Sequence, residues 1–339
     1  MKLEQEQLES IACGATDFVK ENGFFRWYRF TDEEQDFFEA YKGGYFFKRT
    51  LCASGVKLAF YTDSKSLALK GVASFSTGRT YYAIDVVCND ECVGSICNFS
   101  NIEGQMYTDK TFDLGAFEKA FSLGEGKKKI EIYMPFSVVI DWEEISLDDG
   151  AFVAPLPPKN VSLLYGDSIT QGYDCLHTSN HYAVKLSKFL EVDFVNKAIG
   201  GEIFNPGLAK LKNDVTPRYI VVAYGTNDWG NGLGLEEFSK NCKDFYLALR
   251  KNYPDAKILA LSPIWRKEIL TEKRTVDFDL IGKTISNVVS EIENAFFIDG
   301  FDLVPHEEKY FADIGLHPND EGFEYYANRL IEKIAATLG

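Results

Sequence analysis

The sequence predicts an α/β protein of two domains, in which a β-sandwich precedes a domain built on a parallel sheet. Its 339 residues exceed the usual length of a single domain. Residues 24–147 are rich in aromatic and β-branched residues. From residue 161 onward, short apolar runs alternate with helical patterns, which is typical of βαβ units. We therefore expect a sandwich domain at 1–150, a linker at 151–159 and a second domain at 160–339.

The N-terminal domain is expected to begin with a helix over residues 4–20. Strands are predicted beyond it, because apolar and polar residues alternate between Gly, Asn and Asp, as in an antiparallel sandwich with one buried face. The clearest of these runs are residues 56–61, 81–87 and 129–134. Residues 151–159, AFVAPLPPK, contain three prolines, which favours a linker.

The second domain is expected to alternate strands and helices. The predicted strands are residues 161–165, 192–195, 219–224, 257–262 and 295–298, and the predicted helices are residues 182–190, 235–251, 278–293 and 320–336. Ligands bind at the carboxyl ends of the strands in sheets of this kind. Ser168 and Asn227 each follow a predicted strand, so we expect them to lie close together.

The composition excludes several classes of partner. A net charge of −15 argues against nucleic acid and against an anionic membrane surface. No apolar run approaches the ~20 residues of a membrane span, and the acidic N-terminal segment does not resemble a signal peptide, so a cytoplasmic protein is expected. Seven cysteines, an odd number, fit reduced thiols. Cys88, Cys92 and Cys97 lack the spacing of a zinc site, so we expect them to be buried strand residues and expect no metal.

Four short segments carry the chemistry. They are Gly166-Asp167-Ser168-Ile169-Thr170, Gly200-Gly201, Gly225-Thr226-Asn227-Asp228 and Asp313-Ile314-Gly315-Leu316-His317-Pro318-Asn319. A serine hydroxyl becomes a useful nucleophile only when a base takes its proton, and four histidines could do so: His177, His181, His306 and His317. Taken alone, the position of Ser168 favours a turn serine that caps the next helix.

The other two segments offer donors for a developing oxyanion. A backbone N–H at Gly201 can approach a substrate oxygen without a side chain in the way, and the Asn227 amide can add a side-chain N–H. Gly-Gly and Asn-Asp are also common turn formers, so neither segment is decisive by itself.

Taken together, these segments resemble the SGNH (GDSL-type) hydrolase superfamily, whose four blocks all fall within residues 160–336. The resemblance implies a three-layer α/β/α domain, Ser168 as nucleophile and His317 as base. It also implies an oxyanion hole formed by the N–H groups of Ser168 and Gly201 and the side chain of Asn227. Neither a metal nor an organic cofactor is implied. Thr170 replaces the last glycine of a Gly-x-Ser-x-Gly elbow, so the α/β-hydrolase fold matches less well.

One position departs from the family pattern. The triad aspartate usually lies three residues before the histidine, where this chain has Ile314, whereas Asp313 lies four before it. We expect Asp313 to orient the imidazole of His317. The alternative is a Ser–His dyad in which a backbone carbonyl orients the ring.

The domain order points to a substrate class. A sandwich, here expected to be jelly-roll-like, in front of an SGNH domain resembles the two-domain carbohydrate esterases, including family two. The resemblance implies a short-chain (acetyl) esterase that deacetylates oligosaccharides through an acyl-enzyme on Ser168. Candidate substrate contacts are Asp167, Tyr173, Asp174, Trp229, Trp265 and Arg266. Both tryptophans could instead be packing residues.

Three alternatives stay open at this point. The chain could be a lipase or thioesterase with a lipid or CoA-like substrate, or it could transfer an acyl group to an acceptor other than water. It could also be a non-catalytic carbohydrate-binding protein with an inactive esterase domain. The sequence does not determine the oligomeric state.

Overall fold

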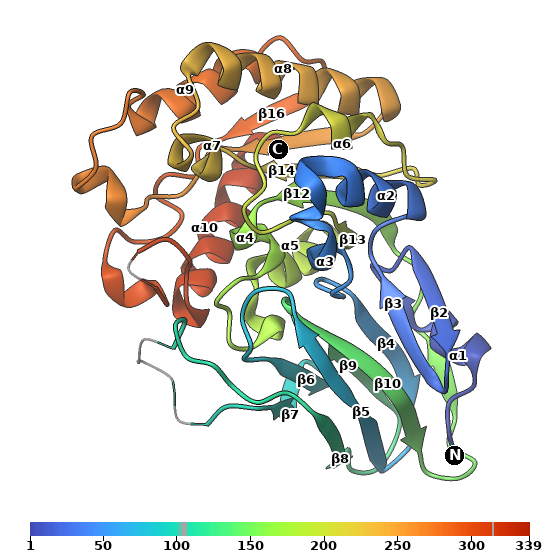
Figure 1. The fold of residues 1–339 in the computed structure, drawn as a ribbon. Coiled ribbons are helices and arrows are strands. Elements are labelled where there is room, and N and C mark those ends of the chain that lie inside the picture. Colours follow the sequence, from blue (N-terminus) through green and yellow to red (C-terminus); the bar gives the residue numbers. More distant parts are fainter. Residues whose placement is uncertain (101, 103–106, 314) are drawn as a thin grey trace.

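The computed structural model describes residues 1–339 apart from 101, 103–106 and 314 (Figure 1). Its N-terminal half contains two antiparallel sheets, with strand orders β1-β4-β9-β6-β7 (β11 pairing with β4) and β2-β3-β10-β5-β8. The strands are β1 (Ala12–Cys13), β2 (Asp17–Glu21), β3 (Phe24–Tyr28), β4 (Lys57–Thr62), β5 (Ser66–Ser76), β6 (Ala83–Cys88), β7 (Glu91–Cys97), β8 (Ala116–Ser122), β9 (Lys128–Tyr133), β10 (Val138–Leu147) and β11 (Val153–Pro155). The predicted sandwich is therefore confirmed.

One apolar core lies between these two sheets. Alternate residues of β4 and β9, such as Leu58 and Ile132, point into it from the first sheet. Trp27 and Trp142 enter it from the second sheet, with their rings 6.4 Å apart and nearly perpendicular. Burial of one face of each sheet explains the alternating pattern in the sequence.

The beginning of the chain differs from the prediction. Helix α1 spans only Gln5–Ser10, and the rest of the segment expected to be helical forms β1 and β2. Gly14 has a φ of +78°, and a Cβ there would lie 2.6 Å from the carbonyl oxygen of Phe194. The chain therefore turns at Gly14 in a conformation that an α-helix cannot continue through, and β2 pairs with β3 instead.

A helical segment inside the N-terminal half was not predicted. It comprises α2 (Asp32–Ala40), a 3₁₀ turn (Tyr41–Gly44) and α3 (Phe47–Thr50). Helix α2 begins with a capping box, in which the Thr31 hydroxyl accepts from the N–H of Glu34 and the Glu34 carboxylate accepts from the N–H of Thr31. Phe38 and Phe46 pack into the core of the C-terminal half, so this segment lies against the second domain (Figure 1).

The C-terminal half is built on a parallel sheet with strand order β13-β12-β14-β15-β16. These strands are β12 (Asn160–Gly166), β13 (Val192–Asn196), β14 (Tyr219–Ala223), β15 (Lys257–Leu261) and β16 (Ala295–Ile298). The helices are α4 (Ser168–Gln171), α5 (Tyr182–Leu190), α6 (Pro206–Lys210), α7 (Thr226–Gly230), α8 (Leu235–Asn252), α9 (Phe278–Val289) and α10 (Asp320–Leu338). Short 3₁₀ helices occur at Thr178–Asn180, Lys267–Leu270 and Glu308–Tyr310. All five strands and the four longer helices were predicted, most within two residues of their observed ends.

Helices cover both faces of this sheet. Tyr165 on β12 and Val222 on β14 pack in the same core as α6, α8 and α9, whereas Leu164 and Val221 pack with α5 and α10 (Figure 1). Because alternate side chains of each strand enter different cores, the predicted three-layer α/β/α arrangement is confirmed.

The segment expected to be a linker is partly a strand. β11 pairs antiparallel with β4, with Ala154 opposite Tyr61, so residues 153–155 belong to the first sandwich sheet. The chain then enters β12 at Asn160. Prolines are tolerated at such a sheet edge because no further strand there needs their missing N–H.

Charged residues are buried where the two halves meet. Lys197 pairs with Glu34 at 2.5 Å, and both side chains are almost fully buried. Arg29 is also fully buried and donates to backbone carbonyls on both sides, including those of Asn196 and Ala198. The two halves are thus joined by buried polar contacts as well as by apolar packing.

Two further expectations can be compared with the structure. Among the described residues, no helix is both long and apolar enough to cross a membrane. The three closely spaced cysteines lie on strands as expected, but only Cys88 is buried, because Cys92 and Cys97 on β7 are exposed.

Candidate active site

Ser168 lies at the carboxyl end of β12, as the first residue of α4. Asp167 caps this short helix, and its carboxylate accepts the N–H of Ile169 at 2.9 Å. The N–H groups in the first turn of a helix have no intrahelical acceptor. The backbone N–H of Ser168 is one of these groups, so it is placed to donate to an oxygen bound beside the hydroxyl.

His317 faces Ser168 from a loop that precedes α10. Its Nε2 lies 2.7 Å from the Ser168 Oγ, which is hydrogen-bonding distance. The His317 carbonyl accepts the N–H of Ala312 at 2.9 Å, and Phe311 pairs with Pro318 across the same loop. These bonds bring Phe311 and Ala312 against His317 and Pro318, which fixes the backbone that carries the imidazole.

Asp313 contacts the other ring nitrogen of His317. Its Oδ2 lies 2.5 Å from Nδ1. Its Oδ1 accepts the N–H groups of Leu316 and His317 at 2.9 and 2.8 Å, which bends the loop back over itself. This bend lets an aspartate four residues before the histidine reach the ring. Ile314, at the position the family pattern would assign, lies outside the described residues.

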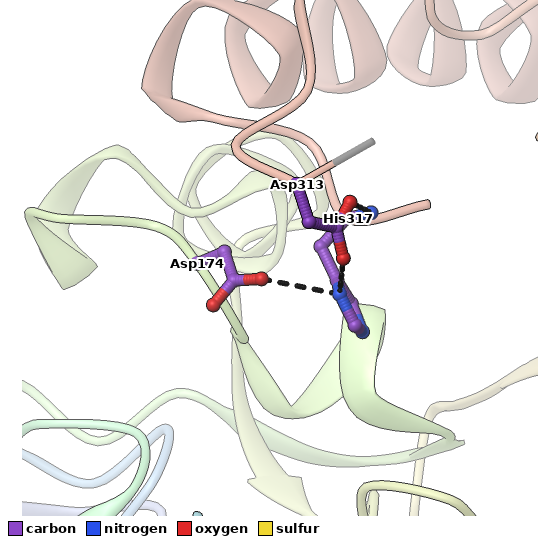
Figure 2. Close-up of side chains that lie close together, drawn as sticks. All are labelled: Asp174, Asp313 and His317. Atoms are coloured by element: carbon purple, nitrogen blue, oxygen red, sulfur yellow. Dashed lines mark hydrogen bonds and ion pairs between the residues drawn. The ribbon is translucent and has the colours of Figure 1, made fainter. Parts of the chain in front are cut away.

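A second carboxylate also lies at Nδ1, and its role was not recognised in the sequence. Figure 2 shows Asp174 and Asp313 both directed toward the imidazole, and Asp174 Oδ2 is 3.1 Å from Nδ1. Asp174 follows the nucleophile helix and has a φ of +70°, in the left-handed region. From the sequence, Asp174 was expected only as a substrate contact, because no local spacing connects it with His317.

The two carboxylates determine the electrostatics of the ring. Burial lowers the pKa of His317, but the negative charges and hydrogen bonds of Asp174 and Asp313 outweigh burial and raise this pKa above its ordinary 6.5. Burial raises the pKa of each carboxyl group, but the imidazolium outweighs it, so the pKa values of Asp174 and Asp313 are both lowered. The arrangement therefore favours an imidazolium, the form His317 takes after accepting a proton.

Gly201 lies in a loop that is tied to the nucleophile segment. The N–H of Gly200 donates to Gln171 Oε1 at 2.7 Å, and the N–H of Ile199 donates to the carbonyl of Gly166 at 3.0 Å. Gly201 itself has a φ of +85°, which a residue with a Cβ rarely adopts. The loop is thus fixed beside Ser168 with a glycine at the predicted donor position.

Asn227 joins the third segment to the second. Its Nδ2 donates to the carbonyl oxygen of Glu202 at 2.9 Å. An amide nitrogen carries two N–H groups, so one remains for a bound oxygen. Asn227 lies on α7, directly after β14, and β14 pairs with β12. The sheet therefore brings the predicted donor segments and the nucleophile to one edge.

Asp167 and Tyr173 are buried close to this centre. Burial raises the pKa of Asp167 to about 6, although the hydrogen bond from the N–H of Ile169 acts in the opposite direction. The Tyr173 ring lies 5.8 Å from the His317 ring and 5.2 Å from that of Phe136. Tyr173 thus forms part of the wall around the imidazole.

Three predicted substrate contacts are instead buried in packing. Trp229 is 3% exposed, and its Nε1 donates to the carbonyl of Val276 at 2.8 Å. Trp265 is 5% exposed and stacks on His306 with ring centres 5.4 Å apart. The guanidinium of Arg266 donates to the carbonyl of Thr226 at 2.9 Å, so it supports the first turn of α7, which carries Asn227. Rings buried in this way offer no open face for a sugar.

The unpredicted helical segment lies against the oxyanion loop. Arg49 Nη1 donates to the carbonyl of Gly200 at 2.8 Å. A Cβ on Gly201 would lie 3.3 Å from the Phe46 ring. A side chain at this glycine would therefore press on the N-terminal half. The signal that could have located the segment is the capping pattern Thr31-x-x-Glu34 before Phe37 and Phe38.

The described residues also contain one group with the composition of a metal site. Asp174, Asp313 and His317 each offer a ligand atom, and these atoms lie within 4.8 Å of one another. The hydrogen bond between His317 Nδ1 and Asp313 already uses these atoms. A cation at this position would have to displace the Nδ1 proton, so the donor set fits a hydrogen-bonded histidine better than a metal.

The C-terminal half of the chain matches a known protein family. Residues 164–325 match the model of the GDSL-like lipase/acylhydrolase family. No curated protein sequence matches the chain significantly.

Solved structures share the fold of nearly the whole chain. The salicylyl-acyltransferase SsfX3 from a tetracycline biosynthetic pathway is 19% identical, with a TM-score of 0.78 over 96% of this chain and 94% of that one. A putative GDSL-like lipase from Bacteroides ovatus is 17% identical, with a TM-score of 0.75 over 98% and 96%. A carbohydrate esterase family 2 enzyme with a carbohydrate-binding domain, from Corynascus (Myceliophthora fergusii), is 21% identical, with a TM-score of 0.62 over 85% and 95%.

The family match covers β14, β15 and β16 and the segments that hold Ser168, Gly201, Asn227 and His317. The solved structures share the order of a sandwich followed by this α/β domain. Residues 164–325 therefore form a domain of the GDSL-like lipase/acylhydrolase family, and the chain is a carboxylic ester hydrolase with an additional N-terminal β-sandwich.

Proposed function

We propose that the chain is a serine esterase that hydrolyses short-chain, chiefly acetyl, esters of oligosaccharides through an acyl-enzyme on Ser168. The observation that carries this proposal is the continuous set of contacts from a carboxylate through an imidazole to a hydroxyl. Asp313 lies 2.5 Å from Nδ1 of His317, and Nε2 of the same ring lies 2.7 Å from the Ser168 Oγ. This is the geometry required of an activated serine.

In the proposed reaction, His317 takes the proton of Ser168 while Oγ attacks the ester carbonyl carbon. The negative charge that develops on the carbonyl oxygen is stabilised by the N–H groups of Ser168 and Gly201 and by the Asn227 amide. His317 then returns the proton to the departing alcohol, which leaves an acetyl group on Ser168. Water, deprotonated by the same imidazole, releases acetate and restores the serine.

The proposed acyl group is small because side chains crowd the oxyanion loop. The Phe46 ring lies where a Cβ on Gly201 would point, and Tyr173 lies within 3.2 Å of a Cβ built on Gly200. Support for a sugar as the alcohol comes from the fold shared with the family 2 carbohydrate esterase. Because Trp229 and Trp265 are buried, a sugar ring would contact other side chains. Tyr45 is 68% exposed and lies beside Phe46, so it is available for such a contact.

A second candidate is acyl transfer to an alcohol other than water. The fold of SsfX3, named as a salicylyl-acyltransferase, matches 96% of this chain, including the N-terminal half. Both reactions form the same acyl-enzyme and differ only in the acceptor. Product analysis with an added acceptor alcohol therefore separates them, since transfer yields a new ester in place of free acid.

The test compares hydrolysis of 4-nitrophenyl acetate, butyrate and octanoate by the wild type and Ser168→Ala. Release of acetate from acetylated xylo- and manno-oligosaccharides is measured alongside. Acetyl preference, acetate from the sugars and no activity in the variant are the expected results. Preference for octanoate would assign the chain to lipases or thioesterases. Sugar binding without turnover in the wild type would assign it to carbohydrate-binding proteins, and activity in Ser168→Ala would exclude this nucleophile.

A further inference from the structure

We propose that Arg79 and Tyr81 of the N-terminal β-sandwich are positioning residues for His317, which they act on by holding Asp174 against the imidazole. The sandwich would then help to set the position and the basicity of the catalytic histidine. This inference rests on the proposed role of His317 as the base.

The carboxylate of Asp174 is held chiefly by the sandwich. Arg79 donates from Nε to Oδ1 at 2.8 Å and from Nη2 to Oδ2 at 2.9 Å, which is the bidentate geometry of a strong pair. The Tyr81 hydroxyl donates to Oδ1 as well. Arg79 and Tyr81 lie in the turn between β5 and β6, more than 90 residues away from Asp174 in the chain.

The backbone around this contact is also fixed from the sandwich. The Tyr107 hydroxyl donates to the carbonyl of Asp174 at 2.7 Å. The N–H of Arg79 donates to Ser137 Oγ at 2.8 Å, which anchors the turn that carries the guanidinium. Asp174 has a φ of +70°, in the left-handed region that a residue with a Cβ uncommonly adopts. The surrounding contacts must maintain this conformation.

The positive charge of Arg79 affects the pKa of His317. Two carboxylates beside one imidazole would hold its proton very tightly, because each negative charge favours the imidazolium. Arg79 carries one positive charge and forms a pair with Asp174. With Arg79 present, Asp174, Asp313, Arg79 and an imidazolium together have no net charge. Arg79 should therefore keep the pKa of His317 lower than two unpaired carboxylates would.

Other groups face His317 and have to be considered in any pH measurement. The nucleophile segment contributes Asp167, Ser168, Tyr173 and Asp174, and the loop of His317 contributes Asp313. The sandwich contributes Arg79, Tyr81 and Tyr107, which reach His317 through Asp174. Of these, Asp167 also titrates in the measured range, since burial raises its pKa to about 6.

The experiment measures kcat/KM for 4-nitrophenyl acetate from pH 5 to 11 in the wild type, Arg79→Gln and Asp174→Asn, because the two carboxylates raise the pKa of His317 to about 10. Only the neutral imidazole can act as a base, so kcat/KM rises with pH through the pKa of His317. Asp174→Asn removes a negative charge and should move this rise to lower pH by 1–3 units, roughly the effect of one adjacent opposite charge. Arg79→Gln leaves Asp174 without its cation and should move the rise to higher pH, by about one unit.

The matched control is Arg26→Gln. Arg26 is also a sandwich arginine paired with an aspartate, Asp141, and its exposure of 29% is close to the 24% of Arg79. If weakening of the sandwich alone explains the result, Arg26→Gln will change the profile as Arg79→Gln does. Arg79→Lys keeps the charge without the bidentate geometry, so its midpoint should return toward that of the wild type. Thermal unfolding of each variant confirms that it is folded.

Shifts in opposite directions for Asp174→Asn and Arg79→Gln, with none for Arg26→Gln, are the expected result. Unchanged midpoints in folded variants, or shifts in the same direction, would overturn the inference. NMR titration of the His317 imidazole in the same variants reads the pKa without any turnover. If the wild type proves inactive but the titration shows both shifts, the proposed function fails while the electrostatic coupling stands.

Discussion

Arg29 offers a direct test of how the N-terminal half supports the active site. Its guanidinium is fully buried and donates to four backbone carbonyls: those of Cys52 at 2.9 Å, Asn196 at 2.7 Å, Ala198 at 2.7 Å and Arg49 at 3.0 Å. Two of these acceptors lie on the segment that leads to Gly200 and Gly201. Arg29→Met keeps an unbranched side chain of similar length but removes all four donors.

The expected loss in free energy of unfolding depends on those four hydrogen bonds. A buried carbonyl left without a donor costs about 1–3 kcal/mol, so four would cost roughly 4–12 kcal/mol. Removal of the buried cation offsets part of this loss, because desolvation of one ion costs several kcal/mol. Burial indeed lowers the pKa of Arg29. We therefore expect Arg29→Met to lower the free energy of unfolding by about 3–5 kcal/mol.

Urea unfolding followed by tryptophan fluorescence measures this loss of stability. The unfolding midpoint should fall to a lower urea concentration, whereas the slope of the free energy of unfolding against urea should stay similar. Arg26→Met serves as the control, because Arg26 is partly exposed and pairs with Asp141 away from the oxyanion loop. In the folded state at low temperature, Arg29→Met should also reduce kcat, since a displacement of about 1 Å at the site can cost about 10²-fold. A loss of stability below about 1 kcal/mol, with unchanged kcat, would refute this reasoning.

Asn227→Ala should lower kcat about 10²–10³-fold with little change in KM, because it removes one oxyanion donor; a loss seen mainly in KM would contradict that role. In the wild type, kcat/KM should rise with pH through a midpoint above 6.5, because the pKa of His317 is raised. Asp167→Asn should leave this midpoint in place. A midpoint near 6 that disappears in Asp167→Asn would instead assign the titration to Asp167. Lys197→Met should destabilise the fold by about 3–5 kcal/mol because it leaves the Glu34 charge buried without its cation. Adding Glu34→Gln removes that charge and keeps an acceptor for the Thr31 N–H, so the double variant should recover much of the loss; equal unfolding midpoints for both would count against the buried pair.

The sequence was most informative where hydrophobic periodicity dominates. Strands such as β16 (Ala295–Ile298) and helices such as α5 (Tyr182–Leu190) were predicted at their observed ends, because buried parallel strands and amphipathic helices have distinct patterns. The proximity of Ser168 and Asn227 followed from the rule that parallel strands end at one edge.

The sequence was less informative where contacts between distant segments decide the structure. No helix was predicted around Phe37 and Phe38, because the aromatic and β-branched composition of residues 24–147 as a whole favoured a sandwich, although these residues belong to a helix capped by Thr31 and Glu34. The contact of Asp174 with His317 joins residues 143 positions apart, as their numbers show, and no local spacing signals it. Trp229 was considered as a sugar platform from its place beside Asn227, but packing against Phe278 buries its ring.

Covalent labelling of Ser168 tests the central claim most directly. A 4-nitrophenyl phosphonate ester reacts with an activated serine, releases one 4-nitrophenol and leaves a stable phosphonyl group on Oγ. We expect the wild type to release about one equivalent, and mass spectrometry should place the added mass on the peptide that contains Ser168. His317→Ala should react far more slowly and Ser168→Ala not at all. Labelling at another residue, or equal release by Ser168→Ala, would contradict the account.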